Sequence, residues 1–186
     1  MNPIINKKDF EDLSTNLRDL AYGYIEKYSP SKQQLKVFLL KKYLMKFRGM
    51  QTKKEVSEII DKIILNLEDN KFLNDELYSD SKARTLLRRG YSIRKIQQSL
   101  FNKGIDGELI KKSLNRIKEN NIEPDFVSAI KLCKKRRIGP LRPDANRELF
   151  YKKDMGVLAR AGFSFEISKK ILSLDKKEYE KLIRII

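Results

Sequence analysis

The chain has 186 residues, enough for one domain or a few small ones. Its 41 lysines and arginines outnumber 25 aspartates and glutamates, and the resulting net charge of +16 favours a polyanionic partner such as nucleic acid or a nucleoprotein. With no histidine and one cysteine, the composition excludes a disulfide framework, a zinc site built from thiolates or imidazoles, and Ser-His or Cys-His nucleophile pairs.

The N-terminal segment resembles neither a signal peptide nor a membrane span. Residues 1–20 carry four acids and no continuous apolar stretch. The scarcity of cysteine also fits a reducing compartment. We therefore expect a soluble, cytoplasmic protein with no membrane partner.

Apolar residues recur at intervals of three and four along the chain, which predicts an all-helical fold. Leading helices are predicted at about 9–27, 75–89 and 144–160, with a further helix at about 125–137. The remaining helices begin at capping residues that are followed four and eight positions later by apolar residues. These caps are Ser31, Thr52, Ser92, Asp106 and Asp175, and Ser164 is an imperfect sixth member with apolar residues at three and seven.

The caps group in pairs, and each pair follows a leading helix. This predicts three tandem three-helix repeats of about 62 residues, stacked in an elongated, curved array. The predicted boundaries are 1–73 with an N-terminal extension, 74–122, and 123–186 with the extra leading helix. The alternative is six unrelated helices that share common capping chemistry.

Two segments share the order glycine, aromatic, serine: Gly90-Tyr91-Ser92 and Gly162-Phe163-Ser164. Glycine can end one helix in the left-handed conformation, the ring can pack back over the preceding turn, and serine can cap the next helix. Gly104 is predicted to end a helix in the same way. We therefore interpret these glycines as architectural rather than phosphate-binding, and both aromatic rings as core.

Cations concentrate in two stretches without acids, 81–105 and 126–143. Because arginine can hold a phosphate or carboxylate at two points, we interpret these blocks as contacts for a nucleoprotein. The alternative is a pair of solvated faces that keep a basic protein soluble. The candidate contact residues are Arg84, Arg88, Arg89, Arg94, Lys95, Lys103, Lys134, Lys135, Arg136, Arg137 and Arg142.

The segment 136–143 ends the second block with two prolines. The prolines are predicted to hold an extended connection that displays three arginines, although an ordinary interhelical loop is equally compatible with the sequence. Phe101, Phe150 and Tyr151 also lie near basic segments, where they could stack on bases.

The sequence offers no catalytic constellation. Cys133 is interpreted as a small buried hydrophobe. Glu55, Glu58 and Asp61 are predicted to be solvated or salt-bridged on a polar helix face. We therefore expect no enzymatic activity, no cofactor and no metal.

Four segments of the chain carry a family resemblance: Phe72-Leu73-Asn74-Asp75, the run from Arg88 to Ile105, and residues 129–137 and 158–171. Together they resemble the RecX family of regulatory proteins. The first is similar to the turn into the family's central repeat, the second to that repeat, and the last two to its third repeat. Two features depart from a regular pattern. Thr52 lies 21 positions after Ser31, whereas Asp106 lies 14 after Ser92, which requires a longer second helix or a longer connection through Arg48-Gly49. Residues 138–143 also split the third unit into four helical pieces.

The resemblance implies a non-enzymatic modulator, usually an inhibitor, of the RecA recombinase filament on single-stranded DNA, within DNA repair, recombination and the SOS response. Such proteins lie in the filament groove across neighbouring protomers and interfere with ATP turnover, strand exchange and filament growth. A monomer is expected, and weak direct DNA binding is compatible with this role. The alternatives from the residues alone are a stand-alone helical module that binds DNA or RNA, and an enzyme such as a nuclease.

Overall fold

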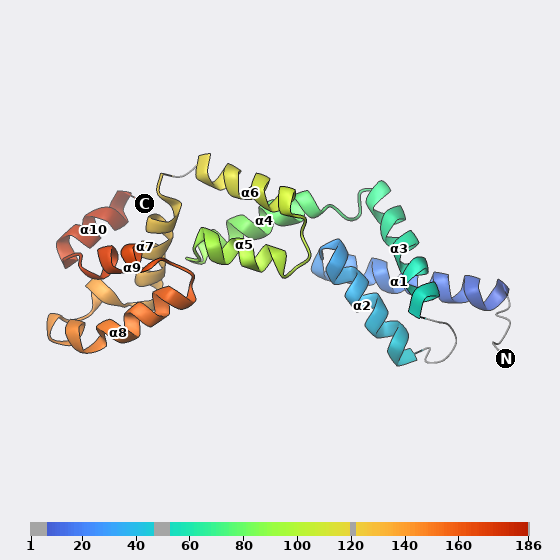
Figure 1. Ribbon diagram of the computed structural model, residues 1–186, viewed down its shortest axis with the longest axis horizontal. Helices are drawn as coiled ribbons and strands as arrows, with labels where there is room; N and C mark the ends of the chain where they lie inside the picture. Colours follow the sequence, from blue (N-terminus) through green and yellow to red (C-terminus); the bar gives the residue numbers. More distant parts are fainter. Residues whose placement is uncertain (1–6, 47–52, 120–121, 186) are drawn as a thin grey trace. The chain divides into compact units, whose positions relative to one another are not determined.

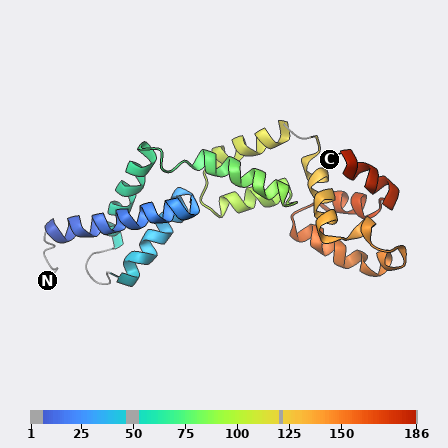
Figure 2. The same cartoon turned by 180° about the vertical axis from the view of Figure 1, so that it is seen from behind.

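The computed structural model describes residues 7–46, 53–119 and 122–185, and within these ranges every regular element is helical (Figures 1 and 2). This confirms the all-helical prediction. The elements are α1 (Lys7–Tyr28), α2 (Lys32–Lys46), α3 (Lys53–Asp69), α4 (Asp75–Arg88), α5 (Ile93–Phe101), α6 (Gly107–Glu119), α7 (Pro124–Arg136), a 3₁₀ turn η1 (Gly139–Leu141), α8 (Asp144–Arg160), α9 (Phe165–Leu172) and α10 (Lys176–Ile185).

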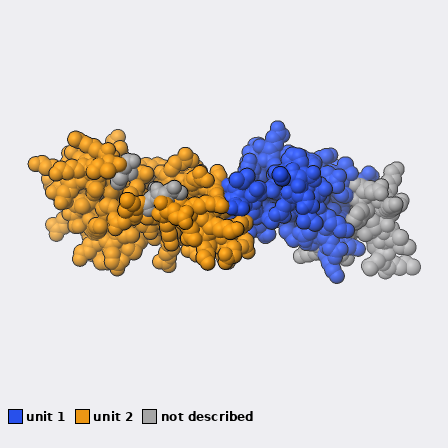
Figure 3. Space-filling view, turned by 90° about the horizontal axis from the view of Figure 1, so that it is seen from above, with its two compact units in different colours: residues 1–78, 103–105 blue, residues 79–102, 106–186 orange. Residues whose placement is uncertain are grey.

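The chain divides into two compact units, coloured separately in Figure 3. Unit 1 comprises residues 1–78 and 103–105, and unit 2 comprises residues 79–102 and 106–186. Unit 1 therefore holds α1 to α3, whereas unit 2 holds most of α4 and all the later helices. The finer division into three repeats and their stacking in a curved array remain predictions.

The core of unit 1 is built from the predicted apolar stripes. Leu17, Leu35, Leu39 and Ile60 are completely buried, and Leu67 is nearly so. Full burial of such a side chain contributes roughly 1.5–3 kcal/mol, so α1, α2 and α3 are held together mainly by these residues.

The capping prediction is confirmed at every predicted position that the structure describes. Each side-chain oxygen accepts a backbone N–H two or three residues ahead: Ser31 from Gln34 (3.2 Å), Ser92 from Lys95 (3.1 Å), Asp106 from Glu108 (2.9 Å), Ser164 from Ile167 (3.3 Å) and Asp175 from Glu178 (2.7 Å). Thr52 lies outside the described residues. Side-chain caps thus fix the N-terminus of four helices in unit 2 and of one helix in unit 1.

Two of the expected irregularities take a definite form. The second helix of the N-terminal segment is longer, because α2 has 15 residues and α5 has 9. The proline-containing segment is not extended: Gly139–Leu141 forms the 3₁₀ turn η1, with Gly139 and Pro140 buried. Proline's fixed φ also suits the start of a helical turn, and Gly139 enters this turn at φ +61°.

Inside unit 1, the start of α2 is tied to segments that follow it much later in the chain. The Lys32 N–H donates to Asp75 Oδ1 at 2.9 Å, and the Ser31 hydroxyl donates to the Lys103 carbonyl at 2.7 Å. Gly104, at φ +73°, lies so close to Gln33 that a Cβ at this position would collide with its side chain. The first amide of α2 therefore depends on the carboxylate of Asp75.

Asp75 predicts a pH-dependent stability. Burial raises the pKa of its carboxyl, although the bond from Lys32 opposes this shift. The folded chain therefore binds the proton more tightly than the unfolded chain, and the charged carboxylate lowers stability above its folded-state pKa. Asp75→Asn keeps an acceptor without the charge and is expected to equal or exceed the parent in free energy of unfolding at neutral pH, with the difference shrinking as the pH falls through that pKa.

Asp75→Ala is the matched comparison, because it removes the acceptor as well as the charge. It is expected to cost roughly 1–3 kcal/mol at neutral pH, the cost of an unsatisfied buried donor. Urea denaturation at a series of pH values measures both variants. An Asn variant as unstable as the Ala variant at neutral pH would contradict this assignment.

Inside unit 2, the start of α5 is tied to later helices in the same manner. The Ile93 N–H donates to Asp125 Oδ1 at 2.7 Å, and the Ser92 N–H donates to the Ala161 carbonyl at 3.1 Å. Gly90 and Gly162 have φ values of +83° and +94°, which confirms their predicted left-handed conformation. The α4–α5 turn is thereby locked against α7 and against the turn between α8 and α9.

Close approach as well as conformation requires glycine in this turn. A Cβ at Gly90 would lie 2.9 Å from Leu132 Cβ, and a Cβ at Gly162 would collide with Ser92 Oγ, the capping oxygen of α5. Gly162→Ala is therefore expected to lower the free energy of unfolding by about 2–4 kcal/mol through strain and overpacking.

Gly107→Ala is the control for this prediction. Gly107 is the first residue of α6, and a Cβ there would meet nothing within 4 Å. Alanine should leave stability within about 1 kcal/mol of the parent or increase it, because it lowers the backbone entropy lost on folding. Thermal or urea denaturation compares the two variants, and similar losses in both would refute a specific junction at Gly162.

The core of unit 2 gathers α7, α8, α9 and α10 around completely buried residues, among them Leu158, Ile171 and Tyr179. The Tyr179 hydroxyl donates to the Ile130 carbonyl at 2.7 Å, so this buried ring brings its polar atom to a partner. Cys133 is fully buried, which confirms its interpretation as a small hydrophobe, and burial raises the pKa of its thiol to about 12.

Candidate polyanion-binding groove

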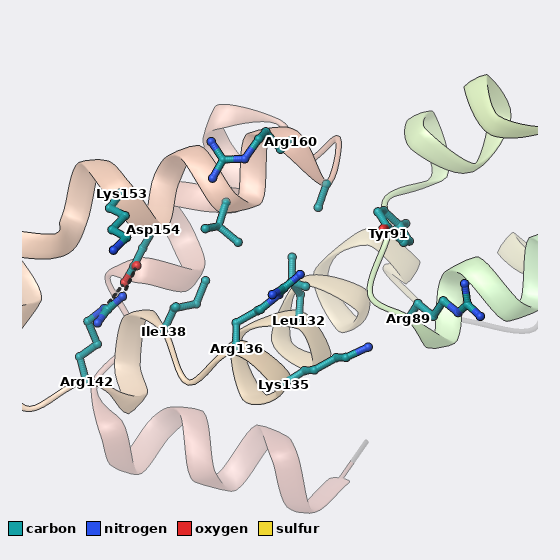
Figure 4. Close-up of a pocket in the computed structure, with 12 residues that line it drawn as sticks. Arg89, Tyr91, Leu132, Lys135, Arg136, Ile138, Arg142, Lys153, Asp154 and Arg160 are labelled. Carbon is teal, nitrogen blue, oxygen red and sulfur yellow. Dashed lines mark hydrogen bonds and ion pairs between the residues drawn. The ribbon is translucent and has the colours of Figure 1, made fainter. Parts of the chain in front are cut away.

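A hollow of about 780 Å³ lies in unit 2 between the end of α7, the helix α8 and the α4–α5 turn (Figure 4). It is lined by six cationic side chains, one carboxylate and a partly apolar floor. The cations are Arg89, Lys135, Arg136, Arg142, Lys153 and Arg160, the carboxylate is Asp154, and the floor contains Tyr91, Leu132, Ile138, Val157 and Ala161. We call this hollow the cationic groove.

The α4–α5 turn supplies Arg89 and Tyr91. The helix α4 ends at Arg88, and the Tyr91 N–H donates back to the Leu86 carbonyl at 3.2 Å, so the chain reverses through Gly90. Arg89 stays exposed, whereas Tyr91 is half-buried against the core of unit 2. The equivalent Phe163 is only 6% exposed, so the core interpretation is confirmed for Phe163 and only in part for Tyr91.

The end of α7 supplies Lys135 and Arg136. Leu132 and Cys133 face the core, which turns the last residues of this helix outward. Arg137 ends the helix at φ +53°, and its N–H donates to the Lys134 carbonyl. Cations are favourable at a helix C-terminus because they offset the negative end of the dipole. Figure 4 shows Lys135 projecting from α7 toward the turn that carries Arg89.

The single carboxylate of the groove is held inside the structure. Asp154 is 2% exposed and accepts from Arg142 through both oxygens, Nε to Oδ2 at 2.6 Å and Nη2 to Oδ1 at 2.7 Å. It also accepts from the Gly139 N–H at 2.9 Å, and Arg142 lies 4.4 Å from the Phe150 ring centroid. The hydrogen bond to Asp154 raises the pKa of the Arg142 guanidinium. Arg142 therefore fixes the η1 turn rather than projecting freely.

With Asp154 neutralised by Arg142, the remaining lining carries five exposed cations. Cations that share a concave surface reinforce one another's potential and attract a polyanion before contact. The arginine forks can then hold phosphate or carboxylate oxygens at two points. The groove is thus equipped for binding anions.

Among the described residues there is no group of three or more His, Cys, Asp or Glu residues that could hold a metal ion.

The structure brings four of the eleven predicted contact residues into this groove: Arg89 from the first basic block, and Lys135, Arg136 and Arg142 from the second. The other seven lie elsewhere. Four of them are exposed outside the groove: Arg84 and Arg88 on α4, and Lys134 and Arg137 beside the groove. Arg94 lines another hollow, and the Lys95 ammonium donates to Gln98. Lys103 belongs to unit 1.

Lys153 and Arg160 were not predicted as contacts. Both residues lie outside the two acid-free stretches, because α8 contains Glu148 and Asp154 among its basic residues. A helical criterion could have found them, because residues seven apart lie on one face after two turns. Their position in the same groove as Arg89 also depends on tertiary packing, which a local sequence pattern cannot predict.

Comparison with known proteins places this chain in a family. The chain is 35% identical over 161 residues to "Regulatory protein RecX" of Myxococcus xanthus (strain DK1622), an alignment that covers 85% of this chain and 84% of the relative. The chain belongs to the RecX family. A second relative, "Regulatory protein RecX" of Agrobacterium fabrum, is 34% identical over 116 residues, 61% of this chain and 58% of that protein.

The family model described as "RecX, second three-helix domain" matches residues 74–114, which run from the start of α4 into α6. Membership confirms the resemblance found in the sequence, and the names of the relatives support a regulatory role. No solved structure is significantly similar to this RecX chain. In the part of the chain that is described, no helix is long and apolar enough to cross a membrane.

The Arg142–Asp154 pair predicts a large coupling energy in this RecX protein. Asp154→Ala leaves Arg142 and the Gly139 N–H without their acceptor and is expected to cost about 3–5 kcal/mol of unfolding free energy. The double variant Asp154→Ala, Arg142→Ala should lose at least about 1 kcal/mol less than the sum of the single variants, because the pair acts as a unit. Urea denaturation supplies all four values, and additive losses would show that the pair is unimportant.

Proposed function

We propose that this chain is a non-enzymatic regulator that binds the RecA filament on single-stranded DNA and inhibits its recombinase and ATPase activities. The observation that carries the proposal is the cationic groove in a member of the RecX family. The proposed site of action is the cytoplasm, the proposed form is a monomer, and no cofactor is needed because binding alone alters the filament.

The chemistry of the partner matches that of the groove. A filament on single-stranded DNA presents phosphates, and its protein surface also presents carboxylates. Arg89, Arg136 and Arg160 can hold either kind of oxygen at two points, while Lys135 and Lys153 act as point charges. The exposed cations Arg84, Arg88, Lys134 and Arg137 are proposed as further contacts beside the groove.

We propose that binding takes place in the filament groove, across neighbouring protomers. Inhibition then follows because a regulator that contacts two protomers at once opposes the rearrangements that accompany ATP turnover and strand exchange. Its affinity would rise through the second contact, which is intramolecular once the first is made. Electrostatic steering would make association fast and dependent on ionic strength.

The double variant Arg89→Glu, Arg136→Glu tests the role of the groove. Both side chains are exposed, so the charge reversal should leave the fold intact while replacing attraction by repulsion. We expect at least a tenfold higher concentration to be required for half-inhibition of the single-strand-dependent ATPase of RecA from the same organism, about 1.4 kcal/mol.

Lys176→Glu, Lys177→Glu is the matched control, since it makes the same change in net charge on exposed residues of α10 outside the groove. An equal loss in this control would show that only net charge matters. Parent protein that leaves both ATPase and strand exchange unchanged would refute the proposed function itself.

The alternative, a stand-alone DNA- or RNA-binding module, makes a different prediction, which a direct binding assay tests. Such a module would bind naked duplex tightly without RecA, and its log affinity would fall by about 0.9 per log unit of salt for each phosphate contact. Binding of naked duplex that is as tight as binding of the filament would favour this alternative.

A further inference from the structure

A second hollow, of about 680 Å³, lies between α5 and α6 and shares no lining residue with the cationic groove. Among the residues that the structure describes, its lining combines an exposed aromatic ring, three carboxamides and three cations, and contains no acid. The residues are Phe101, Gln97, Gln98, Asn115, Arg94, Lys111 and Lys118, with Gly107, Ile110 and Leu114. We call it the α5–α6 groove.

Phe101 is not explained by packing. It is the last residue of α5, and 72% of its surface is exposed, whereas its neighbour Leu100 is completely buried. Ile96 and Leu100 already fill the core-facing stripe of this short helix, so Phe101 adds an aromatic face to the groove rather than to the core.

The polar residues form two facing stripes. On α5, Arg94, Gln97 and Phe101 are spaced by three and four, which places them on one face of the helix. On α6, Lys111, Asn115 and Lys118 are spaced by four and three and share a face in the same way. Both stripes line the same hollow, so ring, carboxamides and cations converge although each helix is short.

We propose that the α5–α6 groove binds single-stranded nucleic acid directly. A base would stack on Phe101, the amides of Gln97 and Asn115 would hydrogen-bond to base edges, and the cations would hold the adjacent phosphates. Carboxamides can donate and accept at once, which suits base edges better than the all-acceptor oxygens of an acidic peptide. A duplex hides its base faces by stacking, so the groove selects single strands.

The neighbouring surface limits the extent of this site. An adjoining hollow shares Arg94, Gln97 and Lys118 with the groove, but it is also lined by Glu123 and Asp125. Although Asp125 accepts from the Ile93 N–H, both carboxylates would repel a phosphate. The strand is therefore confined to the part of the surface between α5 and α6 that lacks acids.

This inference goes beyond the proposed function, and its test needs no RecA. The full chain is titrated onto fluorescein-labelled oligodeoxythymidine, oligouridine and a DNA duplex, and binding is followed by anisotropy. Phe101→Ala is expected to bind both single strands roughly tenfold more weakly, as expected for the loss of one stacked base. The parent should bind the duplex more weakly than it binds either single strand, and Phe101→Ala should bind the duplex as tightly as the parent does.

Phe165→Ala is the matched control, because Phe165 is 62% exposed in the same unit and lines neither groove. It should bind single strands like the parent. Lys118→Glu is a second probe that should weaken binding at low salt and reduce the slope of log affinity against log salt by at least about 0.7, the value for one lost single-strand phosphate contact. Since the side chains of Phe165 and Lys118 are both exposed, the denaturation midpoints of these two variants should stay at the parent value.

Two results would overturn the inference: single-strand affinity of Phe101→Ala equal to that of the parent, or an equal loss in Phe165→Ala. The ATPase assay with the Arg89→Glu, Arg136→Glu variant is read separately, so failure of the filament proposal leaves the anisotropy result unaffected. Conversely, loss of stacking in Phe101→Ala would support the α5–α6 groove even if the chain did not inhibit RecA.

Discussion

The first amides of a helix have no partner within the helix, and here two of them are satisfied by an aspartate from a later helix. Lys32 donates to Asp75 in unit 1, and Ile93 donates to Asp125 in unit 2. The second bond helps to position the cationic groove, because it holds the α4–α5 turn against α7. The Ser92 N–H, which donates to the Ala161 carbonyl, and the close approach of Gly90 to Leu132 hold the same turn. The position of Arg89 relative to Lys135 therefore depends on how the start of α5 is satisfied and packed.

The groove also depends on keeping its one carboxylate out of reach of a ligand. Asp154 lies beneath the surface and is occupied by Arg142 and by the Gly139 amide, so its charge anchors the η1 turn instead of neutralising the exposed cations. Those cations repel one another, but their exposure to water and salt limits the cost. A polyanion would relieve that repulsion on binding. The exposed cations thus contribute little to the stability of the fold, but they would interact favourably with a bound polyanion.

Features that depend on a few neighbouring residues could be predicted from the sequence. The helices, the caps and the left-handed glycines all follow from interactions within about one helical turn, and Gly90 and Gly162 adopt the predicted conformation. The groove could be predicted only in part. Arg89, Lys153 and Arg160 line it together only because the α4–α5 turn packs beside α8, and the sequence does not show which turn packs on which helix. The η1 turn was missed since its conformation rests on Asp154, which accepts from Gly139 across 15 residues.

The two grooves of unit 2 differ in chemistry, and the difference constrains how they can be used. The cationic groove has arginines around a floor in which Tyr91 is only half-buried, so charge dominates what it can recognise. The α5–α6 groove has fewer cations but adds carboxamides and the exposed ring of Phe101, which can respond to the bases themselves. A nucleoprotein filament presents both a charged protein surface and a strand. Two separate grooves allow each to be contacted without one competing for the residues of the other.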